Sequence, residues 1–262
     1  RSLMPPDAVA RVLDHVRARL SLAPDVEITL EANPGTIERG RFAEYRAAGI
    51  TRVSLGAQTF QPAQLAALGR IHSADETRIA AQELHAAGLD NFNLDLMVAL
   101  PGQDEAAALA DVREALALQP AHLSHYQLTL EPGTVFGGRP PDNLPAHDQA
   151  ADMQERCHVL LAEAGFQRYE TSAFARPGRR CRHNLNYWQF GDYLGIGAGA
   201  HGKLSFPHRI VRQVRWREPA RYMQEALAGS AVSNQHEVGR ADLPFEFMVN
   251  QLRLAEGFEP AR

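Results

Sequence analysis

The chain has 262 residues, which is enough for one large domain or two modest ones with a buried core. Hydrophobic residues make up 45% of it and charged residues 22%, which is typical of a folded protein and excludes a disordered one. The net charge of −4 lacks the basic excess that nucleic acids require, so we expect no nucleic-acid partner. No apolar run reaches the ~18 residues of a membrane span and no signal peptide is recognisable, so we expect a cytoplasmic protein without a membrane span.

The two cysteines, Cys157 and Cys181, are too few and too far apart for a disulfide framework or a thiolate metal cluster. Cys157 falls within a helical apolar pattern, so we expect a small buried side chain there. Neither end of the sequence resembles a natural terminus, because the first residues run straight into a helix and the last ones follow an apolar helical stretch. We therefore expect a fragment of a longer protein.

Predicted strands and helices alternate along the first two thirds of the chain. The strands are expected at residues 26–31, 52–58, 91–98 and 123–130. Three helices are expected to end at Ala-Gly pairs, whose glycines are Gly49, Gly88 and Gly165. Ser73 and Glu76 fit a capping box, and Asp104 fits a helix N-cap. Such alternation is typical of parallel βαβ units.

Each predicted strand alternates apolar and polar residues, so one face of every strand is polar. A parallel strand buried on both faces has a nearly continuous apolar run instead. One explanation is an antiparallel sheet with a wet outer face, although hairpins need no helices between their strands. The other, which we favour, is a partial parallel barrel. Its helices cover the apolar face, and its polar face lines a hollow for a polar ligand.

Polar side chains gather at the carboxyl ends of the predicted strands, where α/β folds bind their ligands. They are Glu31, Asn33, Gln58, Asp95, Thr129 and Glu131. A single polar residue of this kind would be explained as part of a loop. Polar residues at the carboxyl ends of all four predicted strands indicate a binding site instead.

Several segments resemble one family when they are taken in order. They are residues 27–36 (EITLEANPGT), 53–60 (VSLGAQTF), 68–73 (LGRIHS), 93–103 (NLDLMVALPGQ) and 126–134 (YQLTLEPGT). These segments resemble the radical SAM enzymes related to oxygen-independent coproporphyrinogen III oxidase. Three later segments, residues 169–178, 182–188 (RHNLNYW) and 191–202 (GDYLGIGAGAHG), resemble the HemW branch of that family, whose members are regarded as heme chaperones. The resemblance covers nearly the whole chain.

The resemblance implies an α/β fold built on a partial (β/α)6 TIM-like radical SAM barrel, here lacking its first strands. It places this barrel in residues 1–170 and an α+β extension, with the HNxxYW and glycine-rich segments, in 171–240. The start of a truncated C-terminal helical domain would fill 241–262. The family binds a [4Fe–4S] cluster through a Cys-x3-Cys-x2-Cys loop that is absent here, so we expect no metal ligands in this chain and no activity from it alone.

Carried over position by position, the resemblance implies a binding site for S-adenosylmethionine. Its contacts would be Glu31, Gln58, Arg70 and Asp95, with a weaker one at Thr129. A carboxylate suits the ammonium, sulfonium and ribose hydroxyls of this ligand, and an arginine suits its carboxylate. The alternative for Arg70 is a surface arginine that neutralises helix-end carbonyls.

The segment 183–188 (HNLNYW) places His183 and Tyr187 four residues apart, and both side-chain types ligate heme iron. The resemblance makes them candidate heme ligands, with Trp188 over the porphyrin face. The alternative is a loop that packs its aromatic rings and holds His183 by a hydrogen bond. Residues 195–199 (GIGAG) lack the context of a dinucleotide-binding motif, and we expect a glycine-lined strand there.

The predicted function is a heme chaperone, which binds heme or porphyrin and delivers heme to an acceptor protein. The intact protein would use S-adenosylmethionine, a [4Fe–4S] cluster and heme. The alternative is an oxygen-independent coproporphyrinogen III oxidase that decarboxylates its substrate by radical chemistry, so whether the intact protein is an enzyme stays open. A polar-ligand barrel without radical chemistry is a third possibility, which the density of motifs disfavours. The HNxxYW segment favours the chaperone.

Overall fold

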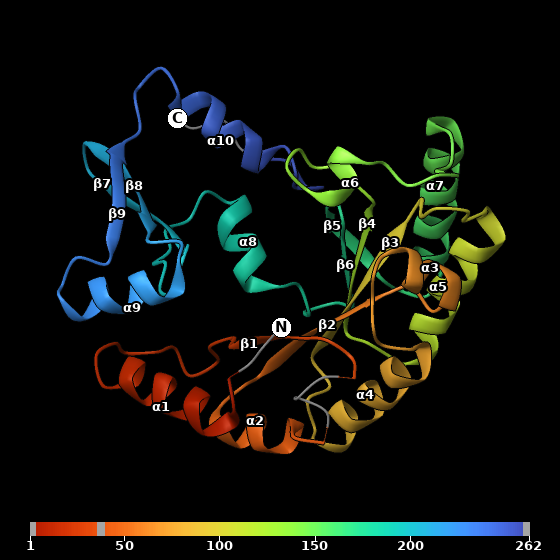
Figure 1. The fold of residues 1–262 in the computed structure, drawn as a ribbon, viewed down its shortest axis with the longest axis horizontal. Coiled ribbons are helices and arrows are strands. Elements are labelled where there is room, and N and C mark those ends of the chain that lie inside the picture. The colour runs from red at the N-terminus through yellow and green to blue at the C-terminus, as the bar shows by residue number, and fades with distance from the viewer. Residues whose placement is uncertain (1–3, 36–39, 259–262) are drawn as a thin grey trace. The chain divides into compact units, whose positions relative to one another are not determined.

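A computed structural model describes residues 4–35 and 40–258 of the chain. It contains two compact units, Arg1–Arg180 and Cys181–Arg262, and each is described by itself (Figure 1). The division into residues 1–170, 171–240 and 241–262 stays a prediction. Within the described residues, no helix combines the length and the apolar character that a membrane crossing requires.

Helices and strands alternate in the first unit (Figure 1). In chain order they are α1 (Pro6–Arg17), β1 (Thr29–Ala32), α2 (Phe42–Ala48), β2 (Arg52–Gln58), α3 (Pro62–Ala67), α4 (Ala74–Ala86), β3 (Phe92–Val98), α5 (Glu105–Ala117), β4 (His122–Gln127), α6 (Val135–Gly138), α7 (His147–Glu163), β5 (Gln167–Glu170) and β6 (Ala173–Ala175). The sheet order is β1-β2-β3-β4-β6-β5. The first four strands pair in parallel and β6 pairs antiparallel with both β4 and β5, so the expected parallel α/β architecture is confirmed.

Two predicted strands have different limits in the structure. β1 begins at Thr29, three residues after the expected start, and β4 ends at Gln127, three residues before the expected end. The neighbouring strand explains the second difference. β3 ends at Val98, whose carbonyl accepts a hydrogen bond from the amide of Leu128. β4 therefore has no parallel partner on this side beyond that point, and Thr129 lies outside the sheet.

The helix ends follow local signals in the sequence. Ser73 begins α4 with the expected capping box, in which its hydroxyl accepts from the Glu76 amide and the Glu76 carboxylate accepts from the Ser73 amide. Asp104 caps α5 by accepting from the Ala107 amide at 2.8 Å. Gly49 ends α2 at φ +115°, a conformation that side chains with a Cβ rarely adopt.

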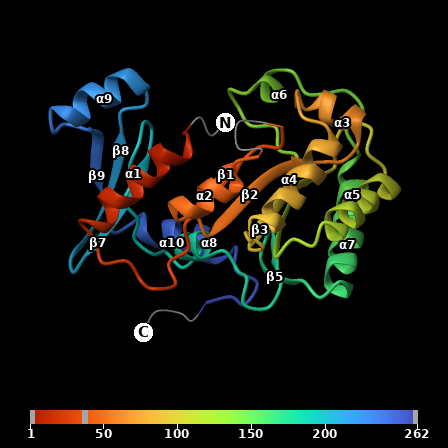
Figure 2. The same ribbon diagram turned by 90° about the horizontal axis from the view of Figure 1, so that it is seen from below.

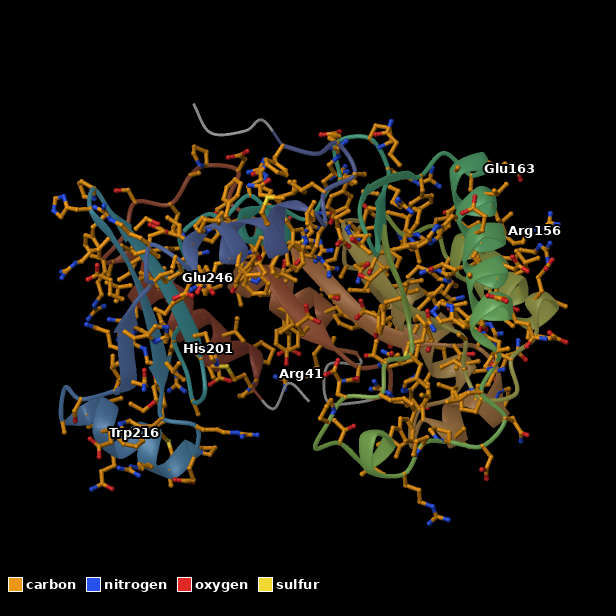
Figure 3. The ribbon with its side chains drawn as sticks, turned by 90° about the horizontal axis from the view of Figure 1, so that it is seen from above. Arg41, Arg156, Glu163, His201, Trp216 and Glu246 are labelled. Carbon is orange, nitrogen blue, oxygen red and sulfur yellow. The ribbon has the colours of Figure 1, made fainter. Side chains whose placement is uncertain are left out.

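The core of this unit lies between the sheet and α2, α4, α5 and α7, which cover one of its faces (Figures 1 and 2). Leu55, Leu94 and Leu123 project from β2, β3 and β4 into this layer and are fully buried. Cys157 lies on the buried side of α7, as expected, whereas Arg156 and Glu163 on the same helix point away from the sheet (Figure 3). The opposite face of the strands carries the polar residues.

The second unit consists of α8 (Arg182–Trp188), β7 (His201–Phe206), β8 (Arg209–Arg215), α9 (Pro219–Leu227), β9 (Val232–Glu237) and α10 (Leu243–Gln251). Its three strands form an antiparallel sheet in the order β7-β8-β9. The strand that we expected at residues 195–199 is wrong, because this segment is a loop that turns into β7. Gly195 still permits a close approach of backbone, since a Cβ there would collide with the carbonyl of His201.

Candidate functional site

A buried hydrogen-bond network lines the polar face of β2, β3 and β4. Asn93 is its centre: its amide nitrogen donates to Ser54 Oγ at 3.0 Å and to Asp95 Oδ1 at 2.8 Å. The Asn93 amide oxygen accepts from Ser124 Oγ at 3.2 Å and lies 2.6 Å from His122 Nδ1. Residues two apart on one strand share a face, and the parallel register places these strands side by side, so the period-2 pattern produces this network.

His122 is neutral at physiological pH. Burial, followed by the nearby charge of Arg52, lowers the pKa of His122 to about 3. Because the Asn93 oxygen can only accept, the Nδ1 atom of His122 carries the proton, and its Nε2 accepts from the Tyr169 hydroxyl at 2.7 Å. Hydrogen-bond partners within the network are present for Ser54, Asn93, Asp95, His122 and Ser124. These bonds make the base of the site rigid.

A polar cavity of about 570 Å³ lies above this network, toward the carboxyl ends of the parallel strands. Its polar lining consists of Glu31, Asn33, Gln58, Arg70, Asp95 and Tyr126. The structure therefore brings together four of the five side chains expected to contact S-adenosylmethionine. Thr129 is exposed and does not belong to the lining among the described residues.

Asn33 and Tyr126 also line the cavity. Asn33 was among the polar residues expected at the strand ends, whereas Tyr126 was not expected at the site. The Tyr126 hydroxyl donates to Gln58 Oε1 at 2.9 Å, and Arg70 donates to Asn33 Oδ1 at 3.4 Å. The signal for Tyr126 was present in the alternation, because Tyr126 follows His122 and Ser124 on the same face of β4. Arg70 thus directs its guanidinium toward the cavity lining, not only toward a helix end.

The electrostatics of the cavity favour a ligand with positive charge. Burial raises the pKa of Asp95, and burial together with the charge of Asp95 raises that of Glu31. Arg52 lies below them on β2 and opposes both shifts, yet its buried Nε has no hydrogen-bond partner in the described part of the chain. Two crowded carboxylates would be relieved by an ammonium or sulfonium group nearby.

A larger cavity, of about 730 Å³, lies between the end of α1 and the start of β1 and β2. It is lined by residues 17–24, 26, 28, 49 and 51, which include none of the expected site residues. Because the expected site residues line only the smaller cavity, we take that cavity as the candidate ligand site.

The second candidate site is a row of aromatic rings in the second unit. His183 and Tyr187 lie on one face of α8, with ring centroids 4.8 Å apart in an edge-to-face arrangement. Tyr187 in turn packs on Tyr193, with centroids 4.3 Å apart. Arg253 stacks over the ring of Trp188 at 4.3 Å, so one face of that indole is occupied. The structure thus places both expected heme ligands together.

The described residues contain no group of three or more histidine, cysteine, aspartate or glutamate side chains that could hold a metal ion. Both cysteines are buried, and burial raises the pKa of Cys157 to about 12, so its thiol is inert. The part of the chain that the structure describes therefore does not fit an iron–sulfur cluster.

Residues 2–115 match the Radical SAM superfamily, and the parallel sheet with a polar cavity at its carboxyl edge agrees with that class. This class implies S-adenosylmethionine and a [4Fe–4S] cluster as cofactors. The structure of coproporphyrinogen III oxidase (HemN) from Escherichia coli superimposes with a TM-score of 0.79, at 21% identity, over 96% of this chain and 60% of that one. That likeness shows a shared fold.

Sequence relatives narrow the class further. The heme chaperone HemW of Escherichia coli (strain K12) is 52% identical over 256 residues, which are 97% of this chain and 66% of the relative. HemW of Mycobacterium tuberculosis is 38% identical over an alignment of 266 positions, which covers 100% of this chain and 67% of the relative. The chain belongs to the HemW family. It spans about two thirds of the length of the curated relatives that it matches.

Proposed function

We propose that this protein acts as a heme chaperone, which binds heme and passes it to an acceptor protein. Two observations support the proposal: the relatives that it matches over nearly its whole length are named heme chaperones, and His183 and Tyr187 lie together on α8. Imidazole and phenol are both ligands of heme iron. A coproporphyrinogen III oxidase is less well supported, because the likeness to that enzyme concerns the fold.

Heme binding is tested by titrating ferric heme into the protein and recording the Soret band. We expect His183→Ala and Tyr187→Ala each to weaken the spectral shift, by about tenfold in apparent affinity. The first removes a candidate iron ligand, and the second removes a phenol whose ring packs on both His183 and Tyr193. His208→Ala, which removes an exposed imidazole elsewhere in the same unit, is the matched control and should bind as the unmodified protein does. Unchanged binding by both α8 variants would remove the assignment.

We also propose that the polar cavity binds S-adenosylmethionine. Glu31 and Asp95 would bind its positively charged and hydroxyl groups, and Arg70 would bind its carboxylate. The side-chain amide of Gln58 would contribute a further contact. Thr129 would contribute at most a contact at the rim. The [4Fe–4S] cluster that this class uses would take its ligands from outside the described residues, and its role in heme transfer is part of the proposal.

Binding of S-adenosylmethionine is tested by calorimetry on the reconstituted protein. We expect Glu31→Ala and Asp95→Ala each to weaken the affinity by about tenfold or more, because each loses a charge-assisted hydrogen bond. Glu131→Ala removes a carboxylate that follows β4 but does not line the cavity, and it should change nothing. Equal affinities in all three variants would reject the cavity as the binding site.

A further inference from the structure

Tyr193 is a third side chain in the aromatic row, and its position is fixed. Its backbone amide donates to the Lys203 carbonyl and its carbonyl accepts from the Lys203 amide, both at 3.0 Å, so the segment is bridged to β7. Its ring packs on Tyr187, which packs on His183. The phenol of Tyr193 therefore belongs to the same cluster as the two expected heme ligands.

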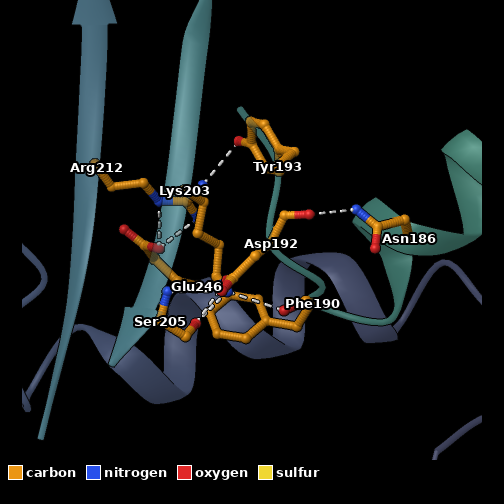
Figure 4. Close-up of polar contacts among 8 residues, drawn as sticks. All are labelled: Asn186, Phe190, Asp192, Tyr193, Lys203, Ser205, Arg212 and Glu246. Carbon is orange, nitrogen blue, oxygen red and sulfur yellow. Dashed lines mark hydrogen bonds and ion pairs between the residues drawn. The ribbon is translucent and has the colours of Figure 1, made fainter. Parts of the chain in front are cut away.

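Arg212 is aimed at the Tyr193 oxygen. Its Nη1 donates to that oxygen at 2.9 Å, while its Nη2 and Nε donate to Glu246 Oε2 on α10 at 2.6 and 3.1 Å (Figure 4). The carboxylate fixes the guanidinium plane, so that the remaining donor points at the phenol. A charge-assisted donor of this kind stays in place when the oxygen becomes anionic.

In the described residues, the hydroxyl of Tyr187 receives no such hydrogen bond from a charged side chain. In the described part of the chain its hydroxyl makes no hydrogen bond, and its ring packs on those of His183 and Tyr193. Iron binds tyrosine as the phenolate, so a phenol whose oxygen receives a hydrogen bond from a cation is the better ligand. Of the two phenols, only that of Tyr193 has a cation directed at its oxygen among the described residues.

The loop that follows Tyr193 presents apolar side chains to solvent. Leu194 is 60% exposed and Ile196 is 76% exposed, although both residues are aliphatic. Arg215 Nε donates to the Gly195 carbonyl at 3.0 Å and the amide of Gly197 donates to the Tyr222 hydroxyl at 3.0 Å, so the loop is held at both glycines. A fixed apolar surface beside an iron ligand suits the flat face of a porphyrin.

We propose that Tyr193, and not Tyr187, ligates ferric heme iron, with Arg212 donating to its oxygen and residues 194–196 lying against the porphyrin. The inference rests on the proposed function. On ligation the phenol releases its proton to solvent and its oxygen donates a lone pair to Fe(III), so no oxidant or reductant is needed. Tyr187 then serves as the ring that spaces Tyr193 from His183.

The test uses ferric heme with the full chain and three phenol deletions. Tyr193→Phe and Tyr187→Phe keep both rings and their stacking, and Arg212 keeps its pair with Glu246. Tyr45→Phe is the matched control: it removes a buried phenol of the first unit, which donates to the Met4 carbonyl and has no part in the proposed heme site. Absorption spectroscopy reports a phenolate-to-iron charge-transfer band as well as the Soret shift.

We expect Tyr193→Phe to lose the charge-transfer band and about tenfold in ferric heme affinity, while Tyr187→Phe and Tyr45→Phe keep the band. A Tyr193→Phe variant that keeps the charge-transfer band overturns the inference. Loss of the band in Tyr187→Phe alone overturns it as well. Heme binding with no charge-transfer band in the unmodified protein also overturns it but leaves the chaperone proposal standing. A complete absence of any Soret shift in the unmodified protein contradicts both proposals.

Discussion

Replacing Asp111 by alanine is expected to lower the free energy of unfolding by about 3–5 kcal/mol. This α5 carboxylate is 2% exposed and accepts three hydrogen bonds. The donors are the Phe60 amide at 2.8 Å, Thr59 Oγ1 at 2.7 Å and Gln103 Nε2 at 3.3 Å. Alanine would leave the Phe60 amide and Gln103 Nε2 in the protein interior without an acceptor, while Thr59 Oγ1 would keep only Gln64 Oε1, at 3.1 Å. Each unsatisfied donor costs about 1–3 kcal/mol.

Chemical denaturation followed by far-UV circular dichroism measures this loss. Asp104→Ala is the matched control on the same helix: it removes an exposed N-cap and should cost about 1 kcal/mol. Asp111→Asn keeps one acceptor oxygen and should fall between the two. If Asp111→Ala costs no more than Asp104→Ala, the network contributes nothing beyond an ordinary cap.

The hydrogen bonds to Asp111 also fix the backbone next to Gln58, one of the residues that line the cavity. Gln58 has φ +67°, in the left-handed region that residues with a Cβ rarely adopt, and this costs about 1 kcal/mol. Thr59 and Phe60, the next two residues, are both held by Asp111. The strained conformation aims the Gln58 amide at Tyr126, so a carboxylate on the far side of the sheet stabilises the geometry of the binding cavity.

Much of the first unit followed from local patterns. Helix caps at Ser73 and Asp104 depend on a few neighbouring residues, so the sequence alone was sufficient to find them. The polar interior followed from the period-2 alternation, which parallel pairing converts into one shared surface. These features need no knowledge of distant contacts.

Features that depend on distant partners were missed or misplaced. β6 pairs antiparallel with β4, although the Ala173–Ala175 segment has no pattern that specifies this neighbour. Thr129 was expected on a strand, but the end of β3 decides where β4 leaves the sheet. From the sequence alone, Asp111 would be predicted as a solvent-facing helix residue. Its three hydrogen-bond donors come from the β2–α3 and β3–α5 connections, which only the folded structure places beside it.

The glycine-rich segment was mispredicted for a related reason. Its alternating glycines match a strand that allows close approach, and Gly195 does approach the backbone of His201. A strand also needs a ladder, but this part of the chain makes only one bridge to β7, between Tyr193 and Lys203, before Gly197 and Gly199 turn it at positive φ. The segment is therefore left as the apolar loop beside Tyr193, a role that its composition alone did not indicate.

Lys203, the sole lysine of the chain, is the second residue whose loss we expect to be costly. Its buried ammonium donates to the Phe190 carbonyl, Asp192 Oδ1 and Ser205 Oγ at 2.8–2.9 Å and lies 4.1 Å from the centroid of the Phe190 ring (Figure 4). Partial burial raises the pKa of Asp192, but the hydrogen bonds from Lys203 and Ser205 outweigh it and bring the pKa to about 2. Lys203 therefore ties the segment between α8 and Tyr193 to β7.

We expect Lys203→Met to lower the free energy of unfolding by about 2–3 kcal/mol. The value is below that for a fully buried ion pair, because the Asp192 side chain is 42% exposed and water can hydrate it once the ammonium is gone. Arg209→Met is the matched control: Arg209 also lies over a phenylalanine, Phe206, at 5.3 Å, but on the surface, so its loss should cost less than about 0.5 kcal/mol. Denaturation of both variants, with hydrogen exchange at the α8 amides, measures the difference. Equal losses of unfolding free energy in the two variants would mean that the Lys203 side chain contributes only packing. If Lys203 anchors the aromatic row, hydrogen exchange at the α8 amides should accelerate in Lys203→Met and not in Arg209→Met.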